Sequence, residues 1–353
     1  MLKAGILVVA LAAAAVVPGS PTVREWSLGK VMQHPPRISL TSARKPPARL
    51  TAPSSRVFRY FGGHVGRAGS TLPDSLFLRP DNLTSRYEVP PWFVTFKAQG
   101  RFVIFTKSAG RSEYRLRLDN KLATAAPQPG PPGDTGLYTI TVPVSGRHTV
   151  VIEMSGTFFF GGVAGKLSRA AYSLGPRAIF FGDSFTEGVG ADSSFTSYVQ
   201  GTAFRLGWGD AWASGASGTG YLSSEPGRPN FVERFSADVL RYRPKVLVLA
   251  GGLNDQGRFS PEQISAAAES LIIKCKCKTV VLSSWWPRPG ATPAEVTELN
   301  RQLAVIARQH GAAYIDVSSW RYPTADGIHP TQAGHEQIAA QLAPAIRAAL
   351  GQR

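Results

Sequence analysis

Five short apolar runs, each followed by a helical pattern, most strongly constrain how the second half of this 353-residue chain can fold. The runs lie at residues 178–181, 210–213, 246–250, 279–283 and 313–317, and amphipathic segments separate them. Strands that alternate with helices form a parallel sheet, because each crossover lays a helix on one of its faces. The pattern predicts a doubly wound α/β domain over residues 176–351.

The helix ends in this region can also be predicted. Residues 260–263 (SPEQ) and 292–295 (TPAE) both match a capping box with proline at the first helical position. Residues 310–311 (HG) mark a helix stop, and Thr331 precedes the last amphipathic segment. The predicted helices therefore alternate with the predicted strands, and the last helix follows the fifth strand, as in a doubly wound sheet.

The preceding part of the chain has period-two hydrophobicity and no helical pattern. Strand candidates lie at residues 92–97, 102–106, 114–119, 138–142, 148–154 and 157–160. Many short strands divided by turns predict an all-β sandwich, jelly-roll-like, over residues 56–165. We expect this domain to pack against its neighbour, with glycan binding as the alternative.

One of these candidates, residues 114–119, alternates apolar and charged side chains. Tyr114, Leu116 and Leu118 are expected to face the core of the sandwich. The alternating charged residues Arg115, Arg117 and Asp119 are expected to face solvent.

The N-terminus has the composition of a targeting segment. Residues 1–20 contain one positive charge, Lys3, followed by the apolar run 4–17, which is typical of a secretory signal peptide and too short to span a bilayer. Residues 21–55 are basic and rich in proline, as in an extended arm or linker. We therefore expect a secreted or cell-envelope protein. A retained apolar N-terminus in a virion-associated protein is the alternative.

The positive charge of the chain lies mainly in its first half. Residues 1–175 carry 22 of the 39 Lys and Arg but only 8 of the 23 Asp and Glu, within a net charge of +16. Such a surface suits an anionic cell-envelope polymer or lipid surface. We expect no nucleic-acid partner, because no nucleic-acid-binding motif occurs, and no transmembrane span.

The chain contains two cysteines, Cys275 and Cys277. Their spacing leads us to interpret them as ordinary thiols, with a disulfide or a metal pair as alternatives. The sequence offers no second Cys/His cluster for a zinc site, so no metal is expected.

Chemistry-bearing residues follow the predicted strands of the α/β domain. Ser184 comes directly after the first strand, in the stretch GDSFTEG, and is a candidate nucleophile. Asp326 and His329 follow the fifth strand, three residues apart. Acyl transfer by serine needs a base and a group that orients it, and these two side chains supply both.

Donors for a developing oxyanion follow the second and third strands. Gly218 lies in the stretch ASGTG, where glycine allows a backbone N–H to approach a ligand, and Asn254 lies in GGLND. Candidate substrate-binding residues at this edge are Asp183, Tyr221, Trp285 and Trp286. The aromatic rings could stack on a sugar or an acyl chain, or pack beneath the loops.

These four stretches, GDSFTEG, ASGTG, GGLND and DGIHP, resemble the four blocks of the SGNH (GDSL-like) hydrolase superfamily. The resemblance implies a flavodoxin-like three-layer α/β/α fold and ester hydrolysis without a cofactor. It implies Ser184 as nucleophile, His329 as base and Asp326 as the residue that orients it. The oxyanion hole would comprise the backbone N–H groups of Ser184 and Gly218 and the Asn254 side chain.

The two-domain arrangement also resembles the acetyl esterases of carbohydrate esterase family two. That likeness implies hydrolysis of acetyl or other short acyl esters on a polysaccharide or cell-envelope glycan, through an acyl-enzyme. The alternatives are a lipase or thioesterase of the same superfamily, and a virion or cell-surface binding protein that carries such a domain.

Overall fold

The computed structural model describes most of the chain beyond its first thirty residues. The described ranges are 31–43, 45–69, 76–80, 90–124, 126–130, 137–171, 175–285 and 291–351. The predicted signal-like segment 1–20 and the start of the predicted arm lie outside them.

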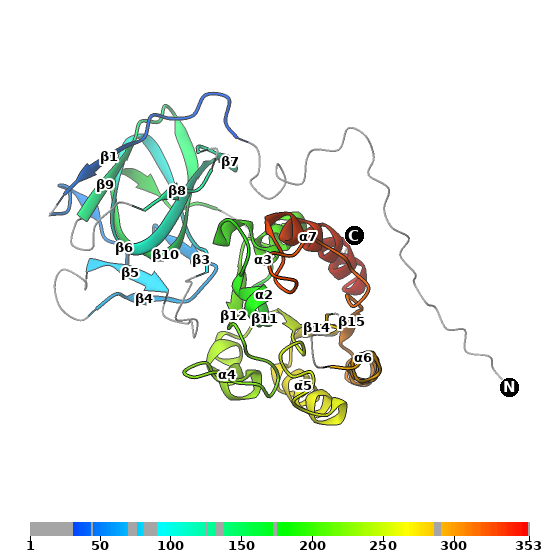
Figure 1. Cartoon of the computed structure of the whole chain (residues 1–353). Coiled ribbons are helices and arrows are strands. Elements are labelled where there is room, and N and C mark those ends of the chain that lie inside the picture. Colours follow the sequence, from blue (N-terminus) through cyan, green and yellow to red (C-terminus); the bar gives the residue numbers. More distant parts are fainter. Residues whose placement is uncertain are drawn as a thin grey trace.

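The C-terminal domain is built on a five-stranded parallel sheet (Figure 1). In spatial order its strands are β12 (Ala211–Gly215), β11 (Ala178–Gly182), β13 (Val246–Ala250), β14 (Lys278–Leu282) and β15 (Ala313–Ile315). All five predicted strands are therefore present. The chain order 2-1-3-4-5 across the sheet is that of flavodoxin-like folds, and it confirms the predicted class.

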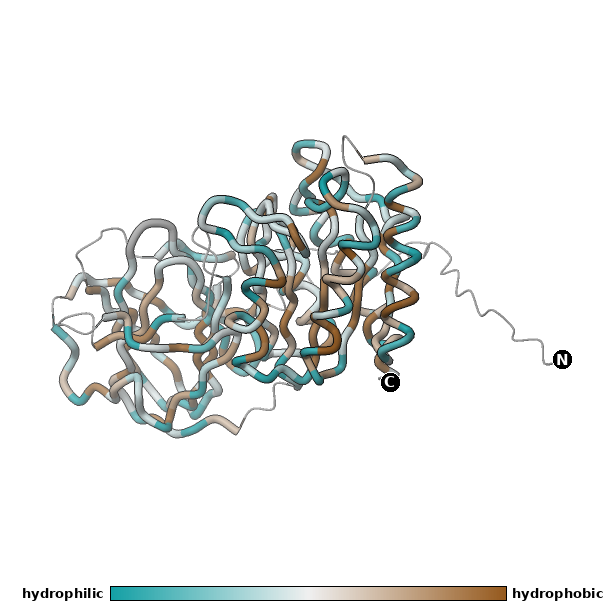
Figure 2. The backbone as a smooth tube through the Cα atoms, turned by 90° about the horizontal axis from the view of Figure 1, so that it is seen from below, coloured by the Kyte–Doolittle hydropathy of each residue, from teal (hydrophilic) through white to brown (hydrophobic). Residues whose placement is uncertain are grey.

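Helices cover both faces of this sheet. One core lies between the sheet and helices α3 (Tyr198–Leu206) and α7 (Gln332–Ala349). The opposite core lies against α4 (Phe231–Asp238), α5 (Pro261–Cys275) and α6 (Pro293–Gln309). Figure 2 shows apolar residues gathered between these layers. Three short helical elements, α2 (Ser184–Glu187), η2 (Ser194–Thr196) and η3 (Leu240–Tyr242), complete the domain.

The predicted capping signals begin the helices where expected. Ser260 and Thr292 each accept a hydrogen bond from the backbone N–H three residues on, and both capping boxes are complete. Thr331 caps α7 through its side chain alone, which accepts from the Gly334 N–H at 3.3 Å. Each such cap contributes about 1 kcal/mol to helix stability.

The N-terminal domain is a ten-stranded antiparallel sheet. Its main strands are β1 (Ser39–Ser42), β9 (Leu137–Val142), β6 (Trp92–Leu118), β10 (Arg147–Ser168), β5 (Leu78–Pro80) and β4 (Val65–Arg67). Beside them pair β2 (Leu50–Thr51), β3 (Arg59–Phe61), β7 (Lys121–Leu122) and β8 (Gln128–Pro129). The antiparallel all-β class is confirmed, and the jelly-roll arrangement stays a prediction.

Several predicted strands of this domain prove to be parts of two long bent strands. The candidates at 92–97, 102–106 and 114–119 all fall within β6 apart from Asp119, and those at 148–154 and 157–160 fall within β10. Gly100 in β6 and Gly156 in β10 have positive φ values of 69° and 65°. Glycine takes this conformation without steric cost, so the strands bend there and keep their pairing.

The prediction of an extended arm at residues 21–55 was wrong for the residues of this range that the structure describes. Strand β1 pairs with β9, and β2 pairs with β10, so this stretch belongs to the N-terminal sheet. All four residues of β1 are exposed. Its placement depends on backbone hydrogen bonds rather than on an apolar face, and hydrophobic periodicity therefore gave no signal.

The prediction that Arg115 and Arg117 face solvent was also wrong. Both are buried, and both donate from Nε to the carboxylate of Glu153. Burial alone would raise the pKa of Glu153, but the two guanidinium charges outweigh it and lower that pKa. The C-terminal domain covers this face, with the Arg115 guanidinium 4.6 Å from the ring centroid of Phe195.

Other contacts join the two domains directly. Ser193 Oγ donates to Glu113 Oε2 at 2.6 Å, and the Gly62 N–H donates to Asp210 Oδ1 at 3.2 Å. In Figure 1 the N-terminal domain lies on the β12 side of the parallel sheet. The expectation that it packs against its neighbour is confirmed.

Cys275 and Cys277 form a disulfide in the structure, and this corrects the interpretation of the pair as ordinary thiols. The turn after α5 brings their Cα atoms to 5.2 Å, within the range that a disulfide spans.

Within the described ranges, no helix has both the length and the apolar composition that crossing a bilayer requires.

Candidate active site

Three strands of the parallel sheet end at a common edge, where most of the predicted site residues lie. The loops after β11, β12 and β13 carry Ser184, Gly218 and Asn254, and the loop before α7 carries Asp326 and His329. Because the carboxyl ends of parallel strands share one edge, residues distant in sequence become neighbours there.

Ser184 is positioned by a tight turn at the end of β11. A Cβ at Gly182 would lie 2.6 Å from the carbonyl oxygen of Ala250 on the neighbouring strand, so only glycine fits without a shift. Asp183 then caps α2, with its Oδ1 accepting from the Phe185 N–H at 3.0 Å. Ser184 thus begins a helix with its side chain at the sheet edge.

His329 and Asp326 line up with this serine. His329 Nε2 lies 2.9 Å from Ser184 Oγ, and His329 Nδ1 lies 2.6 Å from Asp326 Oδ2. With a proton on Nδ1, the imidazole donates to the carboxylate and accepts from the serine hydroxyl. This is the arrangement of a nucleophile, a base and an orienting acid.

The Asp326 carboxylate also shapes the loop that holds the histidine. Its Oδ1 accepts the backbone N–H groups of Ile328 and His329 at 3.0 and 2.7 Å. The side-chain hydrogen bond from His329, followed by that residue's backbone N–H, lowers the pKa of Asp326 to about 2. The carboxyl is therefore ionised throughout the neutral range, as its orienting role requires.

The oxyanion donors lie around the turn at residues 216–219. The Thr219 N–H closes this turn on the Ala216 carbonyl at 3.2 Å, and Gly218 takes a φ of 78° within it. Among the described residues, the N–H groups of Gly218 and Ser184 have no hydrogen-bond acceptor. One hydrogen of Asn254 Nδ2 donates to the Thr219 carbonyl at 2.9 Å, which leaves the other for a ligand.

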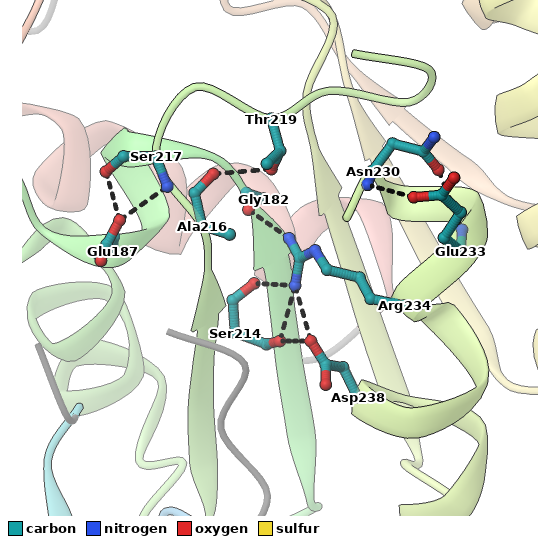
Figure 3. A network of polar contacts seen from close by, with 10 residues as sticks. All are labelled: Gly182, Glu187, Ser214, Ala216, Ser217, Thr219, Asn230, Glu233, Arg234 and Asp238. Carbon is teal, nitrogen blue, oxygen red and sulfur yellow. Dashed lines mark hydrogen bonds and ion pairs between the residues drawn. The ribbon is translucent and has the colours of Figure 1, made fainter. Parts of the chain in front are cut away.

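Sequence reasoning missed the polar residues that hold this turn (Figure 3). Glu187, on α2, accepts from both the backbone N–H and the hydroxyl of Ser217, the former at 2.7 Å. Asp255 accepts three consecutive backbone N–H groups just beyond the turn, those of residues 221–223. The only signal in the sequence was the position of these two acids within the GDSFTEG and GGLND stretches.

A buried arginine links the carboxyl ends of strands β11 and β12. Arg234 Nη2 donates to the Gly182 carbonyl at 2.7 Å, and its Nη1 pairs with Asp238 at 2.9 Å and contacts Ser214 (Figure 3). An arginine on a predicted amphipathic helix gave no indication of this position, because charged helical residues usually face solvent.

The prediction of a substrate-binding role is wrong for three of the four candidate residues in this structure, because their side chains are buried. Tyr221 and Trp285 are 0% exposed, and Trp285 stacks on Phe185 with ring centroids 5.0 Å apart. They support the loops, which was the alternative interpretation. Asp183 is likewise 0% exposed and serves as a helix cap. The fourth candidate, Trp286, lies outside the described residues.

Asp183 has an unusual environment beside the serine. Its Oδ2 is buried without a hydrogen-bond partner, and desolvation raises its pKa to about 7.

Across the described ranges, no group of three or more His, Cys, Asp or Glu is arranged to hold a metal ion.

The fold and this site together define the class of the C-terminal domain, a serine hydrolase on a flavodoxin-like sheet. Residues 180–337 match the profile of the GDSL-like Lipase/Acylhydrolase family. This part of the chain is therefore similar to that family, and the protein is an ester hydrolase. The GDSL lipase Rv0518 of Mycobacterium tuberculosis is 28% identical over 199 residues, which cover 50% of this chain and 83% of the relative.

Solved structures with both domains are also similar to this chain. A carbohydrate esterase family 2 enzyme with a carbohydrate-binding domain, from Corynascus thermopiles (Myceliophthora fergusii), has a TM-score of 0.63 at 20% identity. The alignment covers 83% of this chain and 99% of that one. A family two carbohydrate esterase from Clostridium thermocellum has a TM-score of 0.61 at 17% identity, covering 84% and 99%.

An acyltransferase has a similar fold. The salicylyl-acyltransferase SsfX3 from a tetracycline biosynthetic pathway has a TM-score of 0.62 at 19% identity, covering 86% of this chain and 98% of that one. At these identities the likeness establishes the two-domain fold and leaves the substrate to be proposed.

Proposed function

We propose that this protein is a serine esterase that removes acetyl or other short acyl groups from a polysaccharide or cell-envelope glycan through an acyl-enzyme. The observation that carries the proposal is the alignment of Ser184, His329 and Asp326, with contacts of 2.9 and 2.6 Å, beside free oxyanion donors. The similarity to carbohydrate esterases over both domains supports a glycan substrate.

The first half of the reaction forms the acyl-enzyme. Ser184 Oγ attacks the ester carbonyl carbon as His329 Nε2 takes the hydroxyl proton. The tetrahedral oxyanion accepts from the N–H groups of Ser184 and Gly218 and from Asn254 Nδ2. His329 then passes its proton to the departing sugar oxygen, which leaves as an alcohol.

The second half returns the serine. A water molecule gives a proton to His329 and attacks the acyl carbon. As the second oxyanion collapses, the bond from carbon to Ser184 Oγ breaks, His329 returns the proton to Oγ, and the carboxylic acid leaves. Preorganised donors of this kind typically account for 10²–10³-fold each in rate, since they need no reorganisation when charge develops.

We propose further that the protein acts outside the cytoplasm. The apolar segment at residues 4–17 and the Cys275–Cys277 disulfide support this, because disulfides persist in oxidising compartments. Mass spectrometry of the protein from its native host tests it, and a mature chain that keeps Met1 would count against export through a cleaved signal.

The substrate proposal is tested with the full chain on two sets of esters. The first is a series of p-nitrophenyl esters from acetyl to decanoyl, and the second is a panel of acetylated glycans assayed for acetate release. A sharp preference for acetyl, with release from at least one glycan and none by Ser184→Ala, is the expected result. A preference for long acyl chains would instead indicate a lipase.

An acyltransferase is the second candidate, favoured by the fold similarity to SsfX3. Product analysis with an added alcohol distinguishes the two activities. Transfer of the acyl group to the alcohol in preference to water would show that the protein is an acyltransferase and would overturn the proposal of a glycan esterase.

A further inference from the structure

A basic cavity lies at the edge of the parallel sheet opposite the active site. Its volume is about 1000 Å³, and it opens where β13 and β14 begin and α5 ends. Five cationic side chains line it, those of Arg243, Lys245, Lys274, Lys276 and Lys278. Among the described residues, no acidic side chain is part of this lining. We call this site the basic pocket.

The charges of the basic pocket are exposed and uncompensated. All five of these residues are exposed, and none forms a salt bridge with a described carboxylate. An acidic residue on α5, Glu269, is already paired with His310, with Nε2 and Oε1 2.6 Å apart. The cations are therefore available to a ligand.

The backbone that carries these cations is well fixed. The Lys278 N–H donates to the Lys245 carbonyl at 3.2 Å, and the Lys245 N–H donates to the Arg177 carbonyl at 2.9 Å. The Cys275–Cys277 disulfide closes the turn around Lys276, whose φ is 50°. The backbone positions from which these cations project are thus fixed before a ligand binds, which removes the entropy cost of ordering the backbone there.

The end of a helix explains only part of this cluster. Cations stabilise the C-terminus of a helix, which accounts for Lys274 and Lys276 at the end of α5. Lys245 and Lys278 instead flank the starts of two strands. Like charges around one cavity repel over a Debye length of about 8–10 Å, and a multivalent anion would remove that repulsion.

We propose that the basic pocket binds phosphate groups of an anionic polymer. Four of its five cations are lysines, which bind phosphate as point charges, and the guanidinium of Arg243 can bind a phosphate through two parallel N–H groups. The pocket and the catalytic loops lie at opposite ends of the strands of the parallel sheet. Strand β11, for example, spans five residues, or about 17 Å, so a polymer held in the pocket leaves the catalytic loops free. The pocket would anchor the enzyme independently of its ester substrate.

The test measures binding of the full chain to inorganic polyphosphate by isothermal titration calorimetry. The pocket variant is Lys274→Gln/Lys276→Gln/Lys278→Gln. The matched control, Lys45→Gln/Arg101→Gln/Arg147→Gln, removes the same charge from exposed positions in the N-terminal domain. We expect the pocket variant to bind at least tenfold more weakly and the control to change less than twofold, with p-nitrophenyl acetate hydrolysis unchanged in both.

Two further probes separate the sources of negative charge. Polygalacturonate supplies carboxylates, and vesicles that contain phosphatidylglycerol supply phosphate on a membrane. Stronger binding to polyphosphate than to either supports the proposal. Equal losses in the two variants, equal affinity for polygalacturonate, or a preference for the vesicles would overturn it.

Discussion

His329 Nε2 lies 2.9 Å from Ser184 Oγ, although 145 residues separate them in the chain. Ser184 follows strand β11, and His329 lies three residues before α7, which packs on the same sheet. The packing of α7 therefore fixes the distance between nucleophile and base.

Removal of either residue should abolish the same step. His329→Ala is expected to lower kcat by roughly 10³–10⁶-fold, because residues that act as one unit share a single function. Ser184→Ala/His329→Ala should be no slower than Ser184→Ala alone. Single-turnover assays with p-nitrophenyl acetate measure this, and multiplicative losses in the double variant would show that the residues act separately.

Asp326→Asn tests the orienting carboxylate. Asparagine keeps an oxygen for the two backbone N–H groups of the loop, but its amide cannot accept from His329 Nδ1 if the oxygen is so engaged. The wrong tautomer then faces Ser184, and we expect kcat to fall roughly 10²–10⁴-fold.

The pKa of Asp326, lowered to about 2, sets the pH dependence of this effect. The carboxylate is ionised at every pH from 5 to 9, so the loss measured across this range should be constant. Asp192→Asn, at an exposed position, is the control for charge alone. A loss confined to one end of the range would contradict the assignment.

Asn254→Ala should lower kcat by roughly 10²–10³-fold and change KM little, because its amide acts on charge that develops only in the transition state. The variant also loses the bond to the Thr219 carbonyl. Melting temperatures therefore accompany the kinetics. A rise in KM at constant kcat would assign Asn254 to substrate binding.

Asp183→Asn should change how stability depends on pH. Burial raises the folded-state pKa of Asp183 to about 7, above its unfolded value near 3.8, so the folded state holds this proton more tightly. The stabilisation that this bound proton gives the folded state is therefore lost as pH rises from about 4 to 7. Between pH 5 and pH 8 the parent should lose roughly 2–3 kcal/mol more than the variant.

Urea unfolding at the two pH values measures this difference. Asp192→Asn is again the control, because that carboxylate is exposed, and it should show the same pH dependence as the parent. Identical pH dependence for Asp183→Asn and the parent would show that Asp183 is not desolvated.

Arg234→Met should lower the free energy of unfolding by about 3–5 kcal/mol, because it leaves the buried Asp238 without its guanidinium partner. Arg234→Met/Asp238→Leu should recover most of that loss, since it removes both charges from the core. Chemical denaturation of the three proteins provides the comparison. A double variant as unstable as the single one would mean that the bond to the Gly182 carbonyl matters most.

The α/β domain was predictable because its strands, caps and loops are local features. Residues 178–181 and 246–250 are continuous apolar runs, and Thr292 and Thr331 cap helices through bonds within a few residues. The candidate nucleophile, base and acid follow from the same logic, since parallel strands place their following loops at one edge.

The N-terminal domain was less predictable, because its structure depends on partners distant in sequence. Strand β1 is exposed on both faces and is placed only by its pairing with β9. Arg115 and Arg117 alternate like solvent-facing residues, yet a second domain covers them and Glu153 balances their charge.

The sequence alone determined the order of strands and helices and the residue types at the catalytic edge, because short-range periodicity and capping specify them. Only the tertiary structure decided which polar groups are buried, such as Asp183 and Arg234, and which aromatic rings lie beneath the loops. Burial depends on elements that pack from elsewhere in the chain, and it sets both the pKa of a carboxyl and the availability of a ring to substrate.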